Sequence, residues 1–307
     1  MKKENIILHK FNSISDLHQA LGFPKPLHPL VSLVNYADIK TPADELPKAL
    51  QLNFFKISYK KYLNGKIKYG QHYYDFDEGG LSFISPNQII SSAEEEKDYS
   101  GYTLLIHPDF IRNYPLAIKI KTYGYFSYAV NEALFLSDKE KQIIFSVFEN
   151  IKEELNSNID DFSQDVLVSH IEVLLNYSNR FYKRQFLTRK TVNNDLLTQM
   201  EQLLNYYFES EKPINDGLPT VEYLANHLNQ SPRYLSDMLR SLTGQNAQQH
   251  IHEKLIEKAK EYLTTSSKTV AEVAYKLGFE HPQSFNKLFK KKTNQTPVQF
   301  KQSFSHN

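Results

Sequence analysis

The chain has 307 residues, of which 40% are hydrophobic and 23% are charged, values that are typical of a folded globular protein. No apolar run approaches the roughly 18–20 residues of a membrane span, and the apolar stretch after the basic start is too short for a signal peptide. The chain has no cysteine, so we expect a cytoplasmic protein without a membrane segment, a disulfide or a thiolate metal site. The net charge of +1 is uneven: from Leu218 onward 12 Lys and Arg stand against 7 acidic residues, which indicates that this part faces a polyanion.

Residues from about 30 to 110 have the composition of β-strands. Aromatic and β-branched residues gather in short segments that end at Gly, Pro, Asn or Ser. The expected strands are Leu52–Tyr59, Lys66–Tyr69, Leu81–Ile84 and Tyr102–Ile106. Asn64-Gly65, between the first two, is typical of a type I′ hairpin turn. Several short strands with regular turn signals predict a β-barrel or a sandwich.

A barrel rich in tyrosine could hold a small molecule, because aromatic walls with polar tips suit sugars and other amphipathic ligands. The candidate residues for binding such an effector are Tyr59, Tyr69, His72, Tyr74 and Tyr102. The alternative is that these side chains are half-buried residues of the sheet and bind nothing. The histidines of this region are scattered, with no His-x-His pair, so we predict no metal site.

From Leu136 onward the pattern becomes helical. Apolar residues recur at helical spacing in the segments Asp138–Leu155, Phe162–Arg184 and Leu196–Phe208. The first two either pair two copies of the chain or cover the β-region. The segment Glu211–Pro219, with two prolines and a glycine, predicts a linker. The expected domains are a β-rich domain at 1–135, a helical segment at 136–210 that is a candidate for dimerisation, and a DNA-binding domain at 211–307.

The last ninety or so residues contain one helix-turn-helix pattern twice. Four positions pair at one offset, and after the turn the offset grows by one residue. The pairs are Thr220/Thr269, Val221/Val270, Ala225/Ala274, Leu228/Leu277, Leu235/Phe285 and Leu239/Phe289. The boundary signals are N-capping residues, prolines at the first helical position, and Asn or Gly at the turn. These are Thr220, Asn229, Ser231 and Pro232 in the first unit and Thr269, Gly278 and Pro282 in the second.

The second helix of each unit is expected to enter the major groove of DNA, with its apolar stripe buried. The stripes are Leu235, Met238, Leu239 and Leu242, then Phe285, Leu288 and Phe289. The outward residues are Arg233, Tyr234, Ser236, Asp237 and Arg240, then Gln283, Ser284, Asn286, Lys287 and Lys290. Arg and Lys suit guanine, Gln and Asn suit adenine, and Lys290 near the helix end suits phosphate. Asp237 fits DNA least well, and either accepts from cytosine or orients Arg233 or Arg240.

A continuous helix is expected over Gln248–Leu263, long enough to hold the two recognition helices about one DNA turn apart. The part of the chain from Leu218 to Phe304 resembles the DNA-binding domain of AraC/XylS-type transcription regulators. The resemblance rests on Leu224-Ala225, Ser231–Leu235, Ala259–Leu263, Val273-Ala274, Leu277–Phe279, Phe285–Lys290 and Thr296-Pro297. The sequence departs from the family pattern at Leu239, where an aromatic is usual, at Leu255, where an Arg is usual, and at Asn294, where a Gly is usual.

The resemblance implies that the outward residues of both recognition helices touch DNA, that the N-terminal domain is cupin-like, and that RNA polymerase is a partner. The expected fold class is α+β, with an N-terminal β-barrel or sandwich, following helices, and an all-α double helix-turn-helix domain. We predict a sequence-specific regulator, an activator, that binds double-stranded DNA, with no catalytic residues and no cofactor. The alternatives are a cupin-type enzyme and an effector-independent, dimeric DNA-binding protein.

Overall fold

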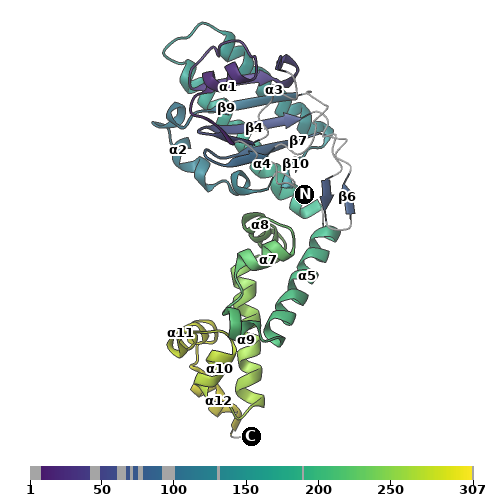
Figure 1. Cartoon of the computed structure of the whole chain (residues 1–307), viewed down its shortest axis with the longest axis vertical. Helices are drawn as coiled ribbons and strands as arrows, with labels where there is room; N and C mark the ends of the chain where they lie inside the picture. The colour runs from purple at the N-terminus through teal and green to yellow at the C-terminus, as the bar shows by residue number, and fades with distance from the viewer. Residues whose placement is uncertain are drawn as a thin grey trace. The chain divides into compact units, whose positions relative to one another are not determined.

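The computed structural model describes residues 8–41, 49–60, 67–69, 72–74, 79–91, 101–129, 132–188 and 190–305. For residues 67–69, 72–74, 90–91, 190–191 and 305 it describes the backbone alone. The chain divides into two compact units, Met1–Gln185 and Phe186–Asn307 (Figure 1). No helix among these residues is both long enough and apolar enough to cross a membrane.

The strands of the first unit form three sheets, of five, three and two strands. The five-stranded sheet has the order β10-β7-β4-β9-β2 and is antiparallel throughout. The three-stranded sheet has the order β1-β3-β8, with β1 parallel to β3, and β5 pairs with β6. The strand bounds are β1 Leu8–Phe11, β2 Val31–Asn35, β3 Ala49–Leu52, β4 Phe55–Lys60, β5 Ile67–Tyr69, β6 His72–Tyr74, β7 Gly80–Ile84, β8 Ile89–Ser91, β9 Gly101–Ile106 and β10 Leu134–Phe135. This mixed β-region confirms the β-rich N-terminal part, whereas the barrel and its cupin-like character stay predictions.

The expected strand Leu52–Tyr59 is confirmed from Phe55 onward, where β4 begins, but its start was wrong, because Leu52 ends β3 in another sheet. The chain bends at Asn53 and Phe54, where the Asn53 amide donates to the carbonyl of Phe11 at 3.0 Å. The Phe54 side chain is fully buried in a cluster with Phe11, Leu52 and Leu105. Alternation of residue types does not reveal the bend, because apolar residues occupy both sides of it. The Asn64-Gly65 turn lies outside the described residues.

Helices and short 3-10 turns cover one face of the five-stranded sheet (Figure 1). Tyr59 and Tyr102, which are opposite each other on β4 and β9, both contact the ring of Phe148. The ring of Phe83 on β7 lies 4.4 Å from the ring of Tyr125. The bounds in this part are α1 Ile14–Ala20, η1 Tyr36–Asp38, η2 Pro108–Ile111, α2 Leu116–Lys119, η3 Ile120–Thr122, η4 Gly124–Ser127, α3 Asp138–Asn156 and α4 Ser163–Thr188. The stretch from η2 to η4 was not predicted from the sequence, and it is called the 108–127 segment below.

The second unit is helical, and its central helix is α9, which contacts α5, α7, α8, α10 and α12. Helices α5 and α12 pack along α9, and α7–α8 and α10–α11 lie towards its opposite ends (Figure 1). The bounds are α5 Lys190–Glu209, α6 Lys212–Asp216, α7 Val221–His227, α8 Pro232–Thr243, α9 Ala247–Thr265, α10 Val270–Lys276, α11 Pro282–Thr293 and α12 Pro297–Ser305. The segment expected as a linker therefore contains a short helix, α6, which contacts α5 and α10. The structure divides the chain into two compact units, and the division into three domains expected from the sequence stays a prediction.

Candidate nucleic-acid interface

Both helix-turn-helix units begin and turn as their sequences predict. The hydroxyl of Thr220 accepts from the amide of Tyr223 at 3.0 Å, and Thr269 caps α10 in the same way. At the two turns Asn229 has φ 53° and Gly278 has φ 92°, the left-handed conformation that each turn requires. The turns also share their hydrogen bonding, since the amide that follows each turn residue donates to a helix carbonyl: Gln230 to Ala225 at 2.9 Å and Phe279 to Ala274 at 3.0 Å.

The similarity between the two helix-turn-helix units continues beyond Leu239 and Phe289, the last positions paired from the sequence. Each recognition helix ends at a threonine whose hydroxyl donates to the carbonyl four residues earlier, Thr243 to Leu239 and Thr293 to Phe289, both at 2.9 Å. The next residue in each case has a left-handed φ, 80° at Gly244 and 61° at Asn294. The departure from the family pattern at Asn294 is thus a change of residue type within an unchanged turn. A capping box then opens the following helix, made by Asn246 and Gln249 before α9 and by Thr296 and Gln299 before α12.

The exposed face of α8 carries an arginine pair held by one carboxylate. Asp237 accepts from Nε of Arg233 at 3.0 Å and from Nη1 of Arg240 at 3.4 Å. The side chains of the arginines are 48% and 53% exposed, whereas that of Asp237 is 18% exposed. Asp237 therefore orients the guanidinium groups, which are the groups free to approach a base edge or a phosphate. Ser236, between them in sequence, is half-buried.

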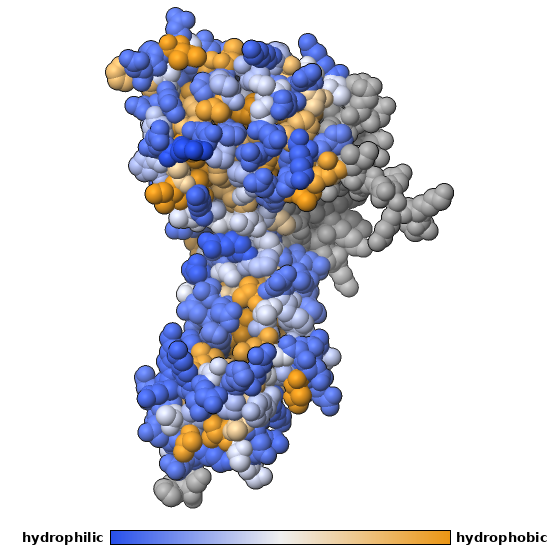
Figure 2. Space-filling model, turned by 60° about the vertical axis from the view of Figure 1, so that its left-hand side comes forward, coloured by the Kyte–Doolittle hydropathy of each residue, from blue (hydrophilic) through white to orange (hydrophobic). Residues whose placement is uncertain are grey.

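The exposed face of α11 carries polar side chains suited to both base edges and phosphates. These residues are Gln283, Ser284, Asn286, Lys287 and Lys290, and all are exposed. Phe285 and Phe289, on the opposite face of the helix, are fully buried and pack it against the rest of the unit. Burial, and then the charges of Lys292 and Lys291, lowers the pKa of His252 on α9, so positive potential extends from the end of α11 onto α9. The face of the second unit drawn in Figure 2 is mostly hydrophilic, with small apolar patches.

Tyr234 does not belong to the exposed face, so its predicted outward orientation was wrong. Its side chain is 6% exposed, and its ring lies edge-on to the ring of Phe186 with centroids 5.3 Å apart. Phe186 lies near the end of α4, so its contact with Tyr234 is distant in sequence. The periodicity of α8 alone could not show it. Tyr234 is a packing residue.

Of the five predicted effector residues, the structure describes the side chains of Tyr59 and Tyr102. Tyr59 is 8% exposed and, with Tyr102, packs against Phe148 of α3. The side chains of Tyr69, His72 and Tyr74 lie outside the described part of the chain. Within that part, no three histidines or acidic side chains are grouped so that they could hold a metal ion.

Comparison with known proteins places a family domain at the two helix-turn-helix units. Residues 224–303 match the family model described as a helix-turn-helix domain. Over 85 residues the chain is 38% identical to an uncharacterized HTH-type transcriptional regulator in the cgkA 5'region of Pseudoalteromonas carrageenovora, covering 28% of this chain and 50% of that protein. Over 83 residues it is 32% identical to the bifunctional transcriptional activator/DNA repair enzyme AdaA of Bacillus subtilis, covering 27% and 39%.

Among solved structures, the C-terminal domain of the two-component response regulator yesN from Fusobacterium nucleatum is 31% identical. That match covers 33% of this chain and 96% of the other chain, with a TM-score of 0.29. The chain spans about half the length of the first curated relative and 39% of the second. Residues 224–303 are a helix-turn-helix domain.

The capping box of α10 gives a pH-dependent prediction. The backbone amide of Thr269 donates to Glu272 at 2.6 Å and its hydroxyl donates at 2.9 Å, and these bonds lower the pKa of Glu272 below its ordinary value of 4.5. A carboxylate with a lowered folded-state pKa stabilises the fold above its unfolded pKa, and the stabilisation is lost as pH falls through the folded value. Glu272→Gln should keep the box, as Gln249 and Gln299 do in theirs, but lose this pH dependence. The difference in unfolding free energy between wild type and variant should be constant at neutral pH and shrink below pH 4.5, as measured by urea denaturation. A difference that persists in acid would contradict the assignment.

Proposed function

We propose that this protein is a sequence-specific transcription regulator that inserts α8 and α11 into successive major-groove segments of one DNA duplex. The observation that carries the proposal is the repeated helix-turn-helix pair, in which both first helices begin at a capping threonine and both second helices present polar side chains to solvent. Because one chain carries two equivalent helix-turn-helix units, we expect both to make equivalent contacts with a partner whose surface repeats at a regular distance. A duplex offers such a partner, because its major groove returns every ~34 Å.

The length of α9 supports simultaneous binding by both units. Its 19 residues span about 28 Å at the rise of an α-helix, close to the repeat of the duplex. Arg233 and Arg240 on α8 have the geometry to fork onto guanine, whereas Gln283 and Asn286 on α11 suit adenine. Lys290, at the end of α11, suits a backbone phosphate.

The finer parts of the proposal rest on the family resemblance. They are activation of transcription through RNA polymerase, pairing of two copies through α3 and α4, and response to a small molecule in the first unit. Pairing would place two double units on one DNA site, so that modest affinity for each would add up to useful occupancy.

The proposal is tested by mobility shift of the full-length protein on the DNA upstream of its own gene and of neighbouring genes. We expect binding that prefers particular sequences and weakens with salt, because lysine and arginine contacts with phosphates release counterions. Competition with unrelated DNA of equal length measures the preference. Binding that is equal on all sequences, or independent of salt, would reject the proposal.

Lys290→Ala should weaken binding to all sequences by a similar factor. If Lys290 neutralises one phosphate, the slope of log affinity against log salt concentration should become shallower by about 0.9. The control is Lys25→Ala, which removes an exposed lysine of the first unit outside α3 and α4 and should leave the slope unchanged. A Lys290→Ala slope equal to that of the wild type would remove this phosphate contact.

A further inference from the structure

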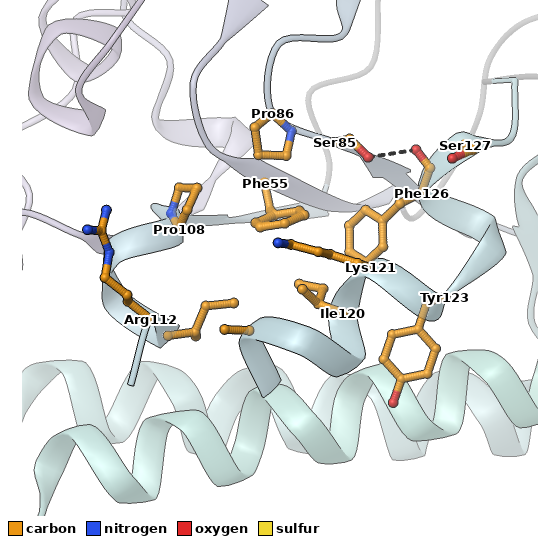
Figure 3. Close-up of a pocket in the computed structure, with 12 residues that line it drawn as sticks. Phe55, Ser85, Pro86, Pro108, Arg112, Ile120, Lys121, Tyr123, Phe126 and Ser127 are labelled. Atoms are coloured by element: carbon orange, nitrogen blue, oxygen red, sulfur yellow. Dashed lines mark hydrogen bonds between the residues drawn. The ribbon is translucent and has the colours of Figure 1, made fainter. Parts of the chain in front are cut away.

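The first unit contains a cavity of about 500 Å³ that neither Tyr59 nor Tyr102 lines. It lies between the start of β4, the turn that follows β7, and the 108–127 segment (Figure 3). Its lining residues are Phe55, Ser85, Pro86, Pro108, Ile111, Arg112, Ala117, Ile120, Lys121, Tyr123, Phe126 and Ser127. A cavity of this size falls within the range of small-molecule sites, about 300–1,000 Å³.

The walls are held in place by polar groups that the protein itself satisfies. The hydroxyl of Ser85 donates to the carbonyl of Phe126 at 3.0 Å. The Tyr123 hydroxyl, which points away from the cavity in Figure 3, donates to the Asn176 side chain on α4 at 2.9 Å. These bonds leave mainly carbon surface facing the cavity, so a ligand there would bind chiefly through an apolar body.

Among the described lining residues there are two cations and no carboxylate. Arg112 pairs with Asp109, so its charge is partly balanced at the edge of the cavity. Lys121 makes no ion pair or side-chain hydrogen bond with any described residue, and it is exposed. Figure 3 shows the side chain of Lys121 extending across the cavity between Phe55 and Ile120, with its amine among apolar walls. An ammonium beside a carbon-lined space attracts one anionic group on an otherwise apolar molecule.

We propose that this cavity binds a small apolar carboxylate, with the carboxylate at Nζ of Lys121 and the hydrocarbon body against Phe55, Ile120 and Phe126. A sugar would leave several hydroxyl groups without partners on these walls, and a cation would be repelled by Lys121 and Arg112. The site is separate from Tyr59 and Tyr102, which pack against α3. The proposal requires only the first unit and does not rest on DNA binding.

The test compares octanoate with octanamide, its neutral isostere, by isothermal titration calorimetry on the full-length protein without DNA. We expect octanoate to bind at least about tenfold more tightly, the scale of one charge-assisted hydrogen bond of roughly 1.5 kcal/mol. Lys121→Gln should remove that preference and leave octanamide affinity unchanged. Lys139→Gln, the control, should change neither affinity. Equal affinity of the wild type for the two probes, or an effect of Lys121→Gln no larger than that of Lys139→Gln, would overturn the proposal.

A second variant tests the apolar wall. Ala117 lines the cavity, so Ala117→Phe should fill part of it and weaken both probes together, by about tenfold or more. The thermal melting of the variant shows whether the unit still folds. If Ala117→Phe does not fold, the Lys121→Gln comparison decides the proposal alone. A folded Ala117→Phe protein that binds octanoate as the wild type does would place the ligand elsewhere and overturn the assignment.

Discussion

Gly278→Ala should lower the unfolding free energy of the second unit by about 3 kcal/mol or more, through strain at a left-handed residue and steric overlap together. Gly278 has φ 92°, and a Cβ placed there would lie 2.7 Å from the Pro213 carbonyl oxygen and 2.7 Å from the carbonyl carbon of Gly217. Both atoms are backbone atoms of the α6 region, and the Gly217 carbonyl is further held by the hydroxyl of Tyr207 at 2.9 Å. The neighbours therefore cannot withdraw as a flexible side chain would. Urea denaturation of the full-length protein, followed by helical circular dichroism, measures the loss.

Gly244→Ala is the matched control, because Gly244 also has a left-handed φ of 80° but has no atom within 4 Å of an added Cβ. Its cost should be that of the backbone conformation alone, about 1 kcal/mol. The difference between the two variants isolates the contact of the second turn with α6. Equal losses would show that this contact does not constrain the turn. Since the turn sets the angle between α10 and α11, Gly278→Ala should also weaken DNA binding at temperatures where the variant remains folded.

The helix-turn-helix domain could be predicted because its signals are local. The capping hydroxyl groups of Thr220, Ser231 and Thr269 each accept a hydrogen bond from the amide three residues later. Asn229 and Gly278 supply the turns for a reason that needs no tertiary structure, the tolerance of each for positive φ. The same local bonds recur after each recognition helix, and a comparison continued to Thr243 and Thr293 would have found them.

The features that were missed depend on residues distant in sequence. Tyr234 is buried by Phe186, which is 48 positions away and precedes the predicted start of the domain. The cavity joins Phe55 on β4 to Ile120 and Lys121 of the 108–127 segment, a stretch whose short turns have no regular apolar period. The bend at Asn53 and Phe54 is fixed by Phe11, on another strand. In each case the sequence gives the residue types, and only the folded chain brings them together.

Arg233→Ala should cost about 1–3 kcal/mol of specific DNA affinity and relax the preference at one base pair, if its guanidinium forks onto guanine. Binding selection with randomised sites would show the relaxed position, and mobility shift would give the affinity. Loss of affinity spread evenly over all sequences would make Arg233 a phosphate contact instead. Arg240→Ala, tested in parallel, assigns the second arginine of the pair in the same way.

Asp237→Asn separates orientation of the arginines from direct base contact. Asp237 holds Arg233 at 3.0 Å and Arg240 at 3.4 Å, so loss of its charge should free both guanidinium groups. It also removes a negative charge from the DNA-facing surface, so binding to unrelated DNA should become tighter while discrimination between sites falls. In the Arg233→Ala background the loss of discrimination caused by Asp237→Asn should be smaller, because the two residues act through one contact. If Asp237 instead accepts from cytosine, Asp237→Asn should change the preferred base at one position, and its effect should add to that of Arg233→Ala.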